Sequence, residues 1–288
     1  MTEKRAWVSA GSFGHTGITW PFTPAGAKQA ISDIAACGYG GVELFGFVLD
    51  VYPGGVDAVG EDLAAAGLEY AASYCSVSLV DPGKRDADLA SMRRWAGQVK
   101  ALGGSVAVVG PDQRTRVEYD SDDYATIAQA LNQIGRLTAE FGVYTCFHPH
   151  TLTPVETREA IAQVMDRIDP AVVCMAPDTG QIAKGGGDPV EVVRTYRDLV
   201  RHLHLKDYIG GVSTVDWVGG GKDRTGYLDY TPVGEGVVDI AGVLAAIGPS
   251  FPGWVMVELD ATDNSERPAI DAARTSKKNL ESIIERMS

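Results

Sequence analysis

Four short apolar runs in the second half of the chain each end in a side chain that can bind a metal ion. The runs are FHPH, MAPDTG, HLHLKD and VMVELD, and their metal-binding side chains are His148, Asp178, His204 and Glu258. Short apolar runs that stop at polar residues predict buried strands. Two imidazoles and two carboxylates form a mixed nitrogen and oxygen set that suits Mn²⁺, Co²⁺, Fe²⁺ or Zn²⁺.

Each of the four residues also has a simpler interpretation. His204 could be a hydrogen-bonded interior histidine, and Glu258 could form an outward salt bridge. Asp178 could only cap the turn that follows it, and His148 could only shape the loop that begins at Pro149. A single shared site explains all four residues together, so the sequence favours one metal centre over four unrelated roles.

Two further residues share a face with these candidates. His150 lies two positions after His148, and Lys206 two positions after His204, which is the repeat of a β-strand. His150 could transfer a proton. Lys206 could polarise a carbonyl group or hold a substrate hydroxyl, and the alternative for this lysine is an ion pair with Asp207.

Glu43 lies inside an apolar run, where an unpaired carboxylate is energetically unfavourable. We expect it to bind a substrate hydroxyl, and the alternative is a buried structural pair. Asp260 and His202 are interpreted as structural. Four aromatic residues could form an apolar wall for a sugar ring, namely Trp20, Phe45, Phe47 and Trp217.

Eight predicted strands alternate with predicted helices along the chain. The strands are residues 6–11, 41–45, 68–76, 105–109, 143–148, 172–176, 199–205 and 254–259. The helices are residues 23–36, 56–66, 86–102, 121–141, 239–247 and 268–286, with two more that begin near residues 153 and 188. Residues 12–20 are expected to form a loop carrying His15 and Trp20.

This alternation implies parallel strands joined by helical crossovers, and closure after the eighth strand predicts an α/β fold, a single (β/α)8 TIM barrel over residues 1–288. The alternative is an open doubly wound sheet. The first strand is not followed by GxGxxG, and the candidate site residues are spread over many strands. In a barrel these residues would all face one mouth.

Helix starts can be read from local capping residues. Thr23 before Pro24 and Asp188 before Pro189 combine a capping side chain with proline at the first helical position. The segment TPVE at residues 153–156 matches a capping box, so we expect a helix to begin there.

Composition excludes several classes of partner. The formal charge is 25 − 38 = −13, which disfavours nucleic acid and anionic membranes as partners. There is no stretch of about 20 apolar residues and no apolar leader, so we expect a cytoplasmic protein without membrane association. The four cysteines form no CxxC pair and are expected to be reduced core residues.

The segment 207–236 is long, polar and rich in glycine. Because it directly follows the strand of His204, we expect it to form a lid or a subunit contact over the barrel mouth. The alternative is an insertion without a role at the site. A homo-oligomer is compatible with this expectation.

At these motifs the chain resembles the xylose-isomerase-like barrel superfamily of sugar isomerases, epimerases and inosose dehydratases. The similar segments are GYGGVELF, HPHTLTPVE, PDTGQ, GGDP, HLHLKD, GEGVVD and GWVMVELD, which span nearly the whole chain in order. The resemblance implies one divalent metal at His148, Asp178, His204 and Glu258, with Mn²⁺ preferred and Co²⁺, Fe²⁺, Mg²⁺ or Zn²⁺ as alternatives. It also implies proton transfer at a carbon next to a carbonyl.

Two departures from that pattern are informative. Ketose epimerases of the group carry a glutamate where this chain has His148, and that glutamate acts as a second acid or base. The pattern around His148 is more similar to the inosose dehydratases. Gln181 replaces a histidine that many relatives carry after DTG.

The sequence therefore predicts a metal-dependent enzyme for a small carbohydrate or cyclitol, in which a proton is removed next to a carbonyl through a metal-stabilised enediolate. Glu258 or His150 would take the proton, while Lys206, Glu43 and Gln181 would hold substrate oxygens. Isomerisation or epimerisation is the first expectation. The alternative is an inosose-type dehydratase or another β-eliminating lyase on a keto-inositol or 3-keto-glycoside. More remote alternatives are a metal-dependent endonuclease and a non-catalytic carbohydrate-binding barrel.

Overall fold

The computed structural model describes residues 13–211, 229–260 and 267–287. Within these residues an eight-stranded sheet has the order β6-β5-β4-β3-β2-β1-β10-β7, and all its pairs are parallel. The strands are β1 Phe13–Thr16, β2 Gly41–Phe45, β3 Glu69–Val77, β4 Val106–Pro111, β5 Tyr144–Phe147, β6 Val173–Met175, β7 His202–Leu205 and β10 Trp254–Val257. Parallel bridges between Met175 and Val200 and between Asp178 and His204 bring the two edges together. The predicted (β/α)8 barrel is confirmed.

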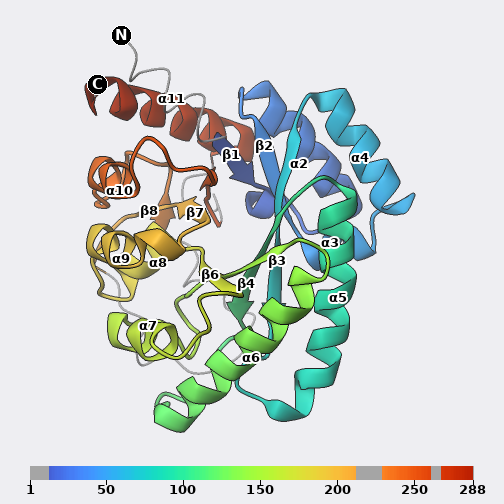
Figure 1. The fold of residues 1–288 in the computed structure, drawn as a ribbon. Helices are drawn as coiled ribbons and strands as arrows, with labels where there is room; N and C mark the ends of the chain where they lie inside the picture. Colours follow the sequence, from blue (N-terminus) through green and yellow to red (C-terminus); the bar gives the residue numbers. More distant parts are fainter. Residues whose placement is uncertain (1–12, 212–228, 261–266, 288) are drawn as a thin grey trace.

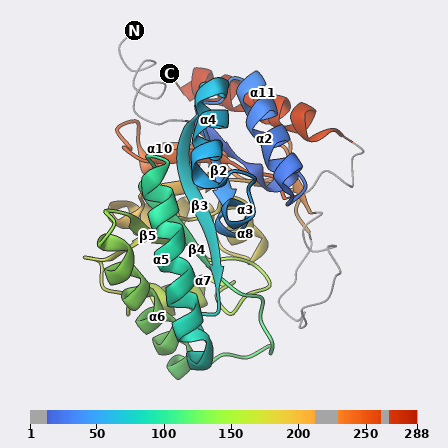
Figure 2. The same cartoon turned by 90° about the vertical axis from the view of Figure 1, so that its right-hand side faces the viewer.

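Helices surround this barrel (Figure 1). They are α2 Pro24–Ala36, α3 Gly46–Asp50, α4 Gly55–Ala66, α5 Arg85–Ala101, α6 Ser121–Ala139, α7 Arg158–Met165, α8 Thr179–Lys184, α9 Pro189–Thr195, α10 Ile240–Ile247 and α11 Ala269–Met287. Figure 2 shows α5 running beside the long strand β3. No helix in the described ranges is both long and apolar enough to cross a membrane.

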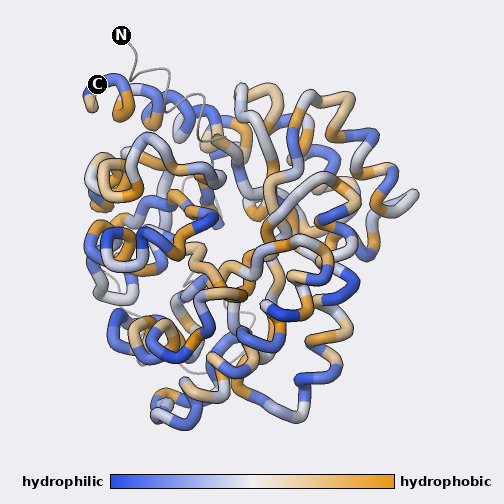
Figure 3. The backbone as a smooth tube through the Cα atoms, in the orientation of Figure 1, coloured by the Kyte–Doolittle hydropathy of each residue, from blue (hydrophilic) through white to orange (hydrophobic). Residues whose placement is uncertain are grey.

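The hydrophobic core lies mainly between the strands and the helices. Outward-facing strand residues such as Val42, Leu44 and Val109 pack there against helix residues such as Ile34 and Ile134. Several helices carry both polar and apolar residues along their length, as the alternating colours in Figure 3 show. This two-sided pattern is what an amphipathic helix needs to cover a sheet.

The barrel interior is divided into an apolar half and a polar half. The apolar half is a cluster of small residues from β3 to β6 and the end of β6, namely Ala72, Val106, Val108, Cys146, Cys174 and Ala176. The polar half comes from β2, β7, β10 and the residues directly after β7 and β10, and consists of Glu43, His202, His204, Lys206, Glu258 and Asp260, all buried. Cys75, Cys146 and Cys174 are buried free thiols, as expected.

Two local expectations were wrong. β1 occupies Phe13–Thr16, inside the segment expected to be a loop, while the strand predicted at residues 6–11 lies outside the described residues. The helix expected from residue 153 begins instead at Arg158, where Thr157 accepts from the Ala160 amide. The capping box failed because Glu156 forms a buried ion pair with Arg114 at 2.5 Å rather than folding back on its own helix.

Three elements were not anticipated. The short helices α3 and α8 directly follow β2 and β6, and a two-stranded antiparallel sheet pairs β8 Asp207–Tyr208 with β9 Tyr230–Thr231. The small sheet joins the two ends of the segment 207–236. Residues 212–228 of that segment lie outside the described residues, so its expected role over the barrel mouth stays a prediction.

Candidate metal centre and active site

The four predicted metal-binding residues lie at one mouth of the barrel, at or near the carboxyl ends of four strands. His148 follows β5, Asp178 follows β6, His204 lies in β7 and Glu258 follows β10. Parallel strands direct these carboxyl ends to one mouth of the barrel, and all four side chains are buried. Ligand atoms of His148, Asp178 and His204 lie within 4.8 Å of one another.

Asp178 has two separate functions for its two oxygens. Oδ1 accepts a hydrogen bond of 2.9 Å from the Gln181 amide and so caps α8. Oδ2 faces the centre of the site, 3.0 Å from the Lys206 Nζ and 4.0 Å from the His148 Nε2. The capping interpretation is therefore compatible with a ligand role.

The two imidazoles are each oriented through one ring nitrogen. His148 donates from Nδ1 to the Ala176 carbonyl at 3.2 Å, which directs Nε2 towards Asp178. Burial, reinforced by the nearby His204, lowers the pKa of His148 well below its ordinary value. The ring is therefore neutral, as a metal ligand must be.

His204 has a carboxylate on each side. Nε2 is 3.0 Å from the Glu43 Oε2, and Nδ1 is 2.5 Å from the Glu258 Oε2. Burial disfavours the imidazolium, but these two carboxylates raise the pKa of His204 well above its ordinary value. A proton and a metal ion would therefore compete for Nδ1.

Lys206 lies at the centre of three carboxylates. Its Nζ is 2.8 Å from Glu258, 3.0 Å from Asp178 and 3.0 Å from Asp260, and its side chain is fully buried. Burial opposes the charge, yet the carboxylates raise the pKa of Lys206 well above its ordinary value. The ammonium is therefore retained and neutralises part of the local negative charge.

Glu43 is enclosed by two imidazoles. Its Oε2 lies 2.7 Å from the His202 Nε2 and 3.0 Å from the His204 Nε2. Burial opposes ionisation, but the adjacent His204 and His202 lower the pKa of Glu43 to about 2. A β-bulge between Val42 and Glu43 sets the register of this carboxylate. This geometry favours the buried pair over contact with a substrate hydroxyl.

The residues present fit a divalent cation. The donor set is two imidazoles and two carboxylates, all buried, and the ligand atoms of His148, Asp178 and His204 are close enough together to share one ion, with the Glu258 Oε2 2.5 Å from the His204 Nδ1. Four buried carboxylates are compensated in part by Lys206 and His204, so the site retains excess negative charge that a dication would offset. A second cluster of Glu43, His202 and His204 also has ligand spacing, but its carboxylate already binds both imidazoles.

His150 is held beside this centre by Gln181. The His150 Nδ1 donates to the Thr151 carbonyl at 2.7 Å, and Nε2 lies 2.9 Å from the Gln181 amide nitrogen. The Gln181 Oε1 accepts from the hydroxyls of Thr151 at 2.5 Å and Tyr230 at 2.6 Å. Gln181 therefore orients His150, a role different from the expected contact with substrate.

The loop after His150 is fixed by an ion pair beneath it. Leu152 has a φ of 63°, which is uncommon for a residue with a side chain. Its amide donates to Glu156 at 3.0 Å, and its carbonyl accepts from the Arg114 amide at 2.8 Å. Because Arg114 and Glu156 also pair with each other, the strained turn that presents His150 is held by surrounding structure.

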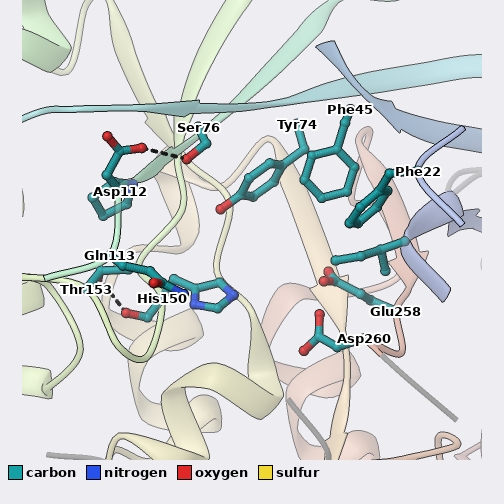
Figure 4. Close-up of a pocket in the computed structure, with 12 residues that line it drawn as sticks. Phe22, Phe45, Tyr74, Ser76, Asp112, Gln113, His150, Thr153, Glu258 and Asp260 are labelled. Atoms are coloured by element: carbon teal, nitrogen blue, oxygen red, sulfur yellow. Dashed lines mark hydrogen bonds between the residues drawn. The ribbon is translucent and has the colours of Figure 1, made fainter. Parts of the chain in front are cut away.

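A cavity of about 490 Å³ opens at this mouth of the barrel. Figure 4 shows His150, Thr153 and Gln113 facing Glu258 and Asp260 across it, with Phe22, Phe45 and Tyr74 on a separate wall. Protons could therefore move to or from a ligand on two sides.

The sequence analysis missed Tyr230, Tyr74 and Phe22, and it treated Asp260 as structural. The position of Asp260, two residues after Glu258, was a usable signal, because alternate strand residues share a face.

Comparisons with known proteins give a consistent picture. A family model described as xylose isomerase-like TIM barrel matches residues 31–283. The inosose dehydratase of Geobacillus kaustophilus (strain HTA426) is 27% identical over 275 residues, covering 90% of this chain and 86% of that protein.

Two solved structures share the fold. The IOLI protein with a binding zinc atom has a TM-score of 0.74 at 15% identity, covering 96% of this chain and 99% of that chain. The 3-keto-D-glucoside 4-epimerase from E. coli has a TM-score of 0.71 at 15% identity, covering 95% of this chain and 98% of that chain. At these identities the likeness establishes the architecture.

Proposed function

Because the chain belongs to the xylose isomerase-like TIM barrel family, we propose that it is a divalent-metal-dependent enzyme that removes a proton next to the carbonyl of a keto-polyol. The observation that carries this proposal is the buried cluster of His148, Asp178 and His204, whose ligand atoms lie within 4.8 Å of one another, beside a cavity lined by His150 and Glu258. The names of the inosose dehydratase relatives support a cyclic keto-polyol as substrate.

His148, Asp178, His204 and Glu258 would hold the cation. When bound, a divalent metal would polarise a carbonyl and a neighbouring hydroxyl oxygen of the substrate and so acidify the adjacent C–H bond. Mn²⁺ is the metal we propose, with Co²⁺, Fe²⁺, Mg²⁺ and Zn²⁺ as alternatives that a reconstitution series would separate. The His148 ring and the Asp178 carboxylate are each held by a backbone contact, so these ligands are preorganised.

We assign proton abstraction to His150. Its Nδ1–H donates to the Thr151 carbonyl, so the basic lone pair is at Nε2, which accepts from the Gln181 amide at 2.9 Å and would take the substrate proton once Gln181 releases it. Burial, with the added effect of the Lys206 charge, lowers the pKa of His150, and the neutral ring can therefore accept a proton. Glu258 and Asp260, across the cavity, supply a second proton-transfer position (Figure 4).

We propose elimination of water as the outcome. The C–H bond next to the carbonyl breaks and its proton passes to His150. The electron pair then forms a C=C bond as the β C–O bond breaks, and the leaving hydroxyl takes a proton from the carboxyl side of the cavity. His148 in place of the second glutamate of ketose epimerases supports elimination over a two-carboxylate epimerisation.

Proton exchange in D₂O tests this function. The Mn²⁺-loaded protein and an inosose should show deuterium incorporation next to the carbonyl, together with a product that has lost one water by mass spectrometry. The His150→Gln variant should react at least about 100-fold more slowly, because general base catalysis contributes on this order. Tyr144→Ala, at the opposite end of β5 and 53% exposed, is the matched control.

The other outcomes separate the alternatives. Exchange with a product of unchanged mass would assign isomerase or epimerase activity. Full activity in His150→Gln would transfer the role of base to Glu258. A protein that binds metal yet exchanges no proton on keto-inositols, ketoses or 3-keto-glycosides would contradict the mechanism.

A further inference from the structure

The cavity at the metal centre has two unlike walls. His150, Thr153, Glu258 and Asp260 form a polar side, while Ile18 and several aromatic rings form an apolar side. Figure 4 shows Phe22, Phe45 and Tyr74 grouped together, away from His150 and Gln113. A single polyol ring, with hydroxyls around its edge, would bind to the polar side of the cavity. It would leave most of the apolar side without a contact.

The aromatic rings form a continuous series from solvent to the metal centre. Ring centroids are 5.6 Å apart for Phe47 and Phe22, 4.8 Å for Phe22 and Phe45, and 4.9 Å for Phe45 and Tyr74. The Tyr74 ring then meets the His148 ring edge-on at 5.4 Å. Phe45 ends β2 and Tyr74 lies in β3, while Phe22 lies between β1 and α2 and Phe47 lies in α3, so neighbouring parts of the barrel assemble the series.

The outer members of the series are exposed. Phe22 and Phe47 retain 45% and 42% of their surface accessible, although each would be more stable if covered. Exposed aromatic residues that adjoin a pocket mark a binding surface more often than scattered apolar residues do. The cavity volume of about 490 Å³ falls within the range of about 300–1,000 Å³ that holds drug-sized ligands. This leaves room for a second ring beside a polyol.

Charge restricts what the second ring can carry. Asp112, Glu258 and Asp260 line the cavity, and no lysine or arginine is among the lining residues that the structure describes. Phosphate and carboxylate groups are normally bound by arginine, lysine or helix N-termini. An anionic substituent would therefore be repelled here, while a neutral planar group could stack on the aromatic wall.

We propose that the substrate is a keto-polyol ring bearing an uncharged aromatic substituent, with the polyol over His150 and the aromatic ring against Phe22, Phe45 and Tyr74. This inference rests on the proposed function for its reactive ketone. It adds a substrate class, namely aryl-substituted polyols or aryl glycosides in their keto form. Phe22 is then a specificity-determining residue that contacts the substituent, and Phe47 packs against Phe22 and Phe45 and supports it; neither takes part in proton transfer.

Binding of unreactive glycosides tests the wall independently of catalysis. Calorimetry on the full-length Mn²⁺-loaded protein would compare 4-nitrophenyl β-D-glucoside with methyl β-D-glucoside, which differ only in the aglycone. We expect the aryl glucoside to bind roughly ten-fold more tightly, as one or two aromatic contacts would give. The anionic 4-carboxyphenyl β-D-glucoside, whose charge lies on the aryl ring, should bind more weakly than the 4-nitrophenyl glucoside.

Variants of the aromatic wall then test where the aryl group of the ligand binds. Phe22→Ala and Phe47→Ala should each weaken the aryl glucoside by several-fold and leave the methyl glucoside unchanged, while Tyr144→Ala should change neither. Equal affinities for the two glucosides, no measurable binding of either, or an aryl preference that survives both phenylalanine variants would overturn the proposal. A change in oligomeric state with unchanged aryl affinity would also overturn it, because the wall would then be a subunit contact.

The two proposals fail separately. Proton exchange on an unsubstituted inosose without any aryl preference would remove only the substrate class. An aryl preference that depends on Phe22, without exchange on any keto-polyol, would remove only the proposed reaction.

Discussion

The two halves of the barrel interior use the same architecture for opposite purposes. In the apolar half, Val108 and Cys146 lie in register on adjacent strands and fill space with small side chains. In the polar half, His204 of β7 lies in register with Met256 of β10, and this half holds three carboxylates, two imidazoles and a lysine, all buried. The first half depends on packing alone, whereas the second depends on charge compensation.

This difference shows that the two halves of the interior contribute to stability in different ways. Buried charges are tolerated only when they are paired, and removing one partner leaves a strongly unfavourable charge. The apolar half contains no buried charge, so its contribution to stability does not depend on a bound ion. The polar half should therefore respond to metal, and the apolar half should not.

Replacing His204 should have the largest effect, because this residue contacts both Glu43 and Glu258. We expect His204→Ala to abolish stoichiometric Mn²⁺ binding and proton exchange. Metal content after dialysis, measured by mass spectrometry, checks this expectation. Cys174→Ala, in the apolar half, is the control that should keep its metal, and a His204→Ala protein with full metal content would remove His204 from the site.

Replacing Lys206 should be the most destabilising change in the metal-free protein. Lys206→Met leaves Asp178, Glu258 and Asp260 without their common cation, and the free energy of unfolding should fall by about 3–5 kcal/mol. Urea unfolding with and without Mn²⁺ measures this loss in the free energy of unfolding. Metal should restore part of the loss, and a stability loss under 1 kcal/mol would show that the carboxylates are not charged as described.

Replacing Glu43 should have an intermediate effect, on metal affinity. Glu43→Gln keeps the shape but loses the charge that orients His202 and His204, and such changes next to metal ligands typically weaken binding by about 10–100-fold. Competition with a fluorescent chelator gives the dissociation constant. Were Glu43 instead a substrate ligand, metal affinity would be unchanged and only KM would rise.

Replacing Val108 should have the smallest effect and one that is independent of metal. Val108→Ala removes two buried methyl groups from the apolar half, and we expect a loss of about 1–2 kcal/mol of unfolding free energy. The loss should be the same with and without Mn²⁺. A metal-dependent loss would mean that the two halves are coupled and that the comparison is too simple.

Local pattern was sufficient for much of the fold and for the proposed metal ligands. The helix starts at Thr23 and Asp188 followed from capping residues next to proline, and both caps are present. The ends of β5, β6, β7 and β10 were readable because apolar runs stop at polar residues. These features depend on residues within one helical turn or one strand, which are the distances over which sequence patterns act.

The sequence by itself determined the barrel and the gathering of His148, Asp178, His204 and Glu258 at one mouth, because parallel crossovers leave few other topologies. Only the tertiary structure decided which buried polar side chains pair with each other. Glu43 meets His202 across 159 positions of the chain, and Glu156 pairs with Arg114 instead of capping its own helix. The aromatic wall is likewise built from residues in or after three different strands. Such pairings are set by barrel closure and strand register, which bring together groups that no local spacing relates.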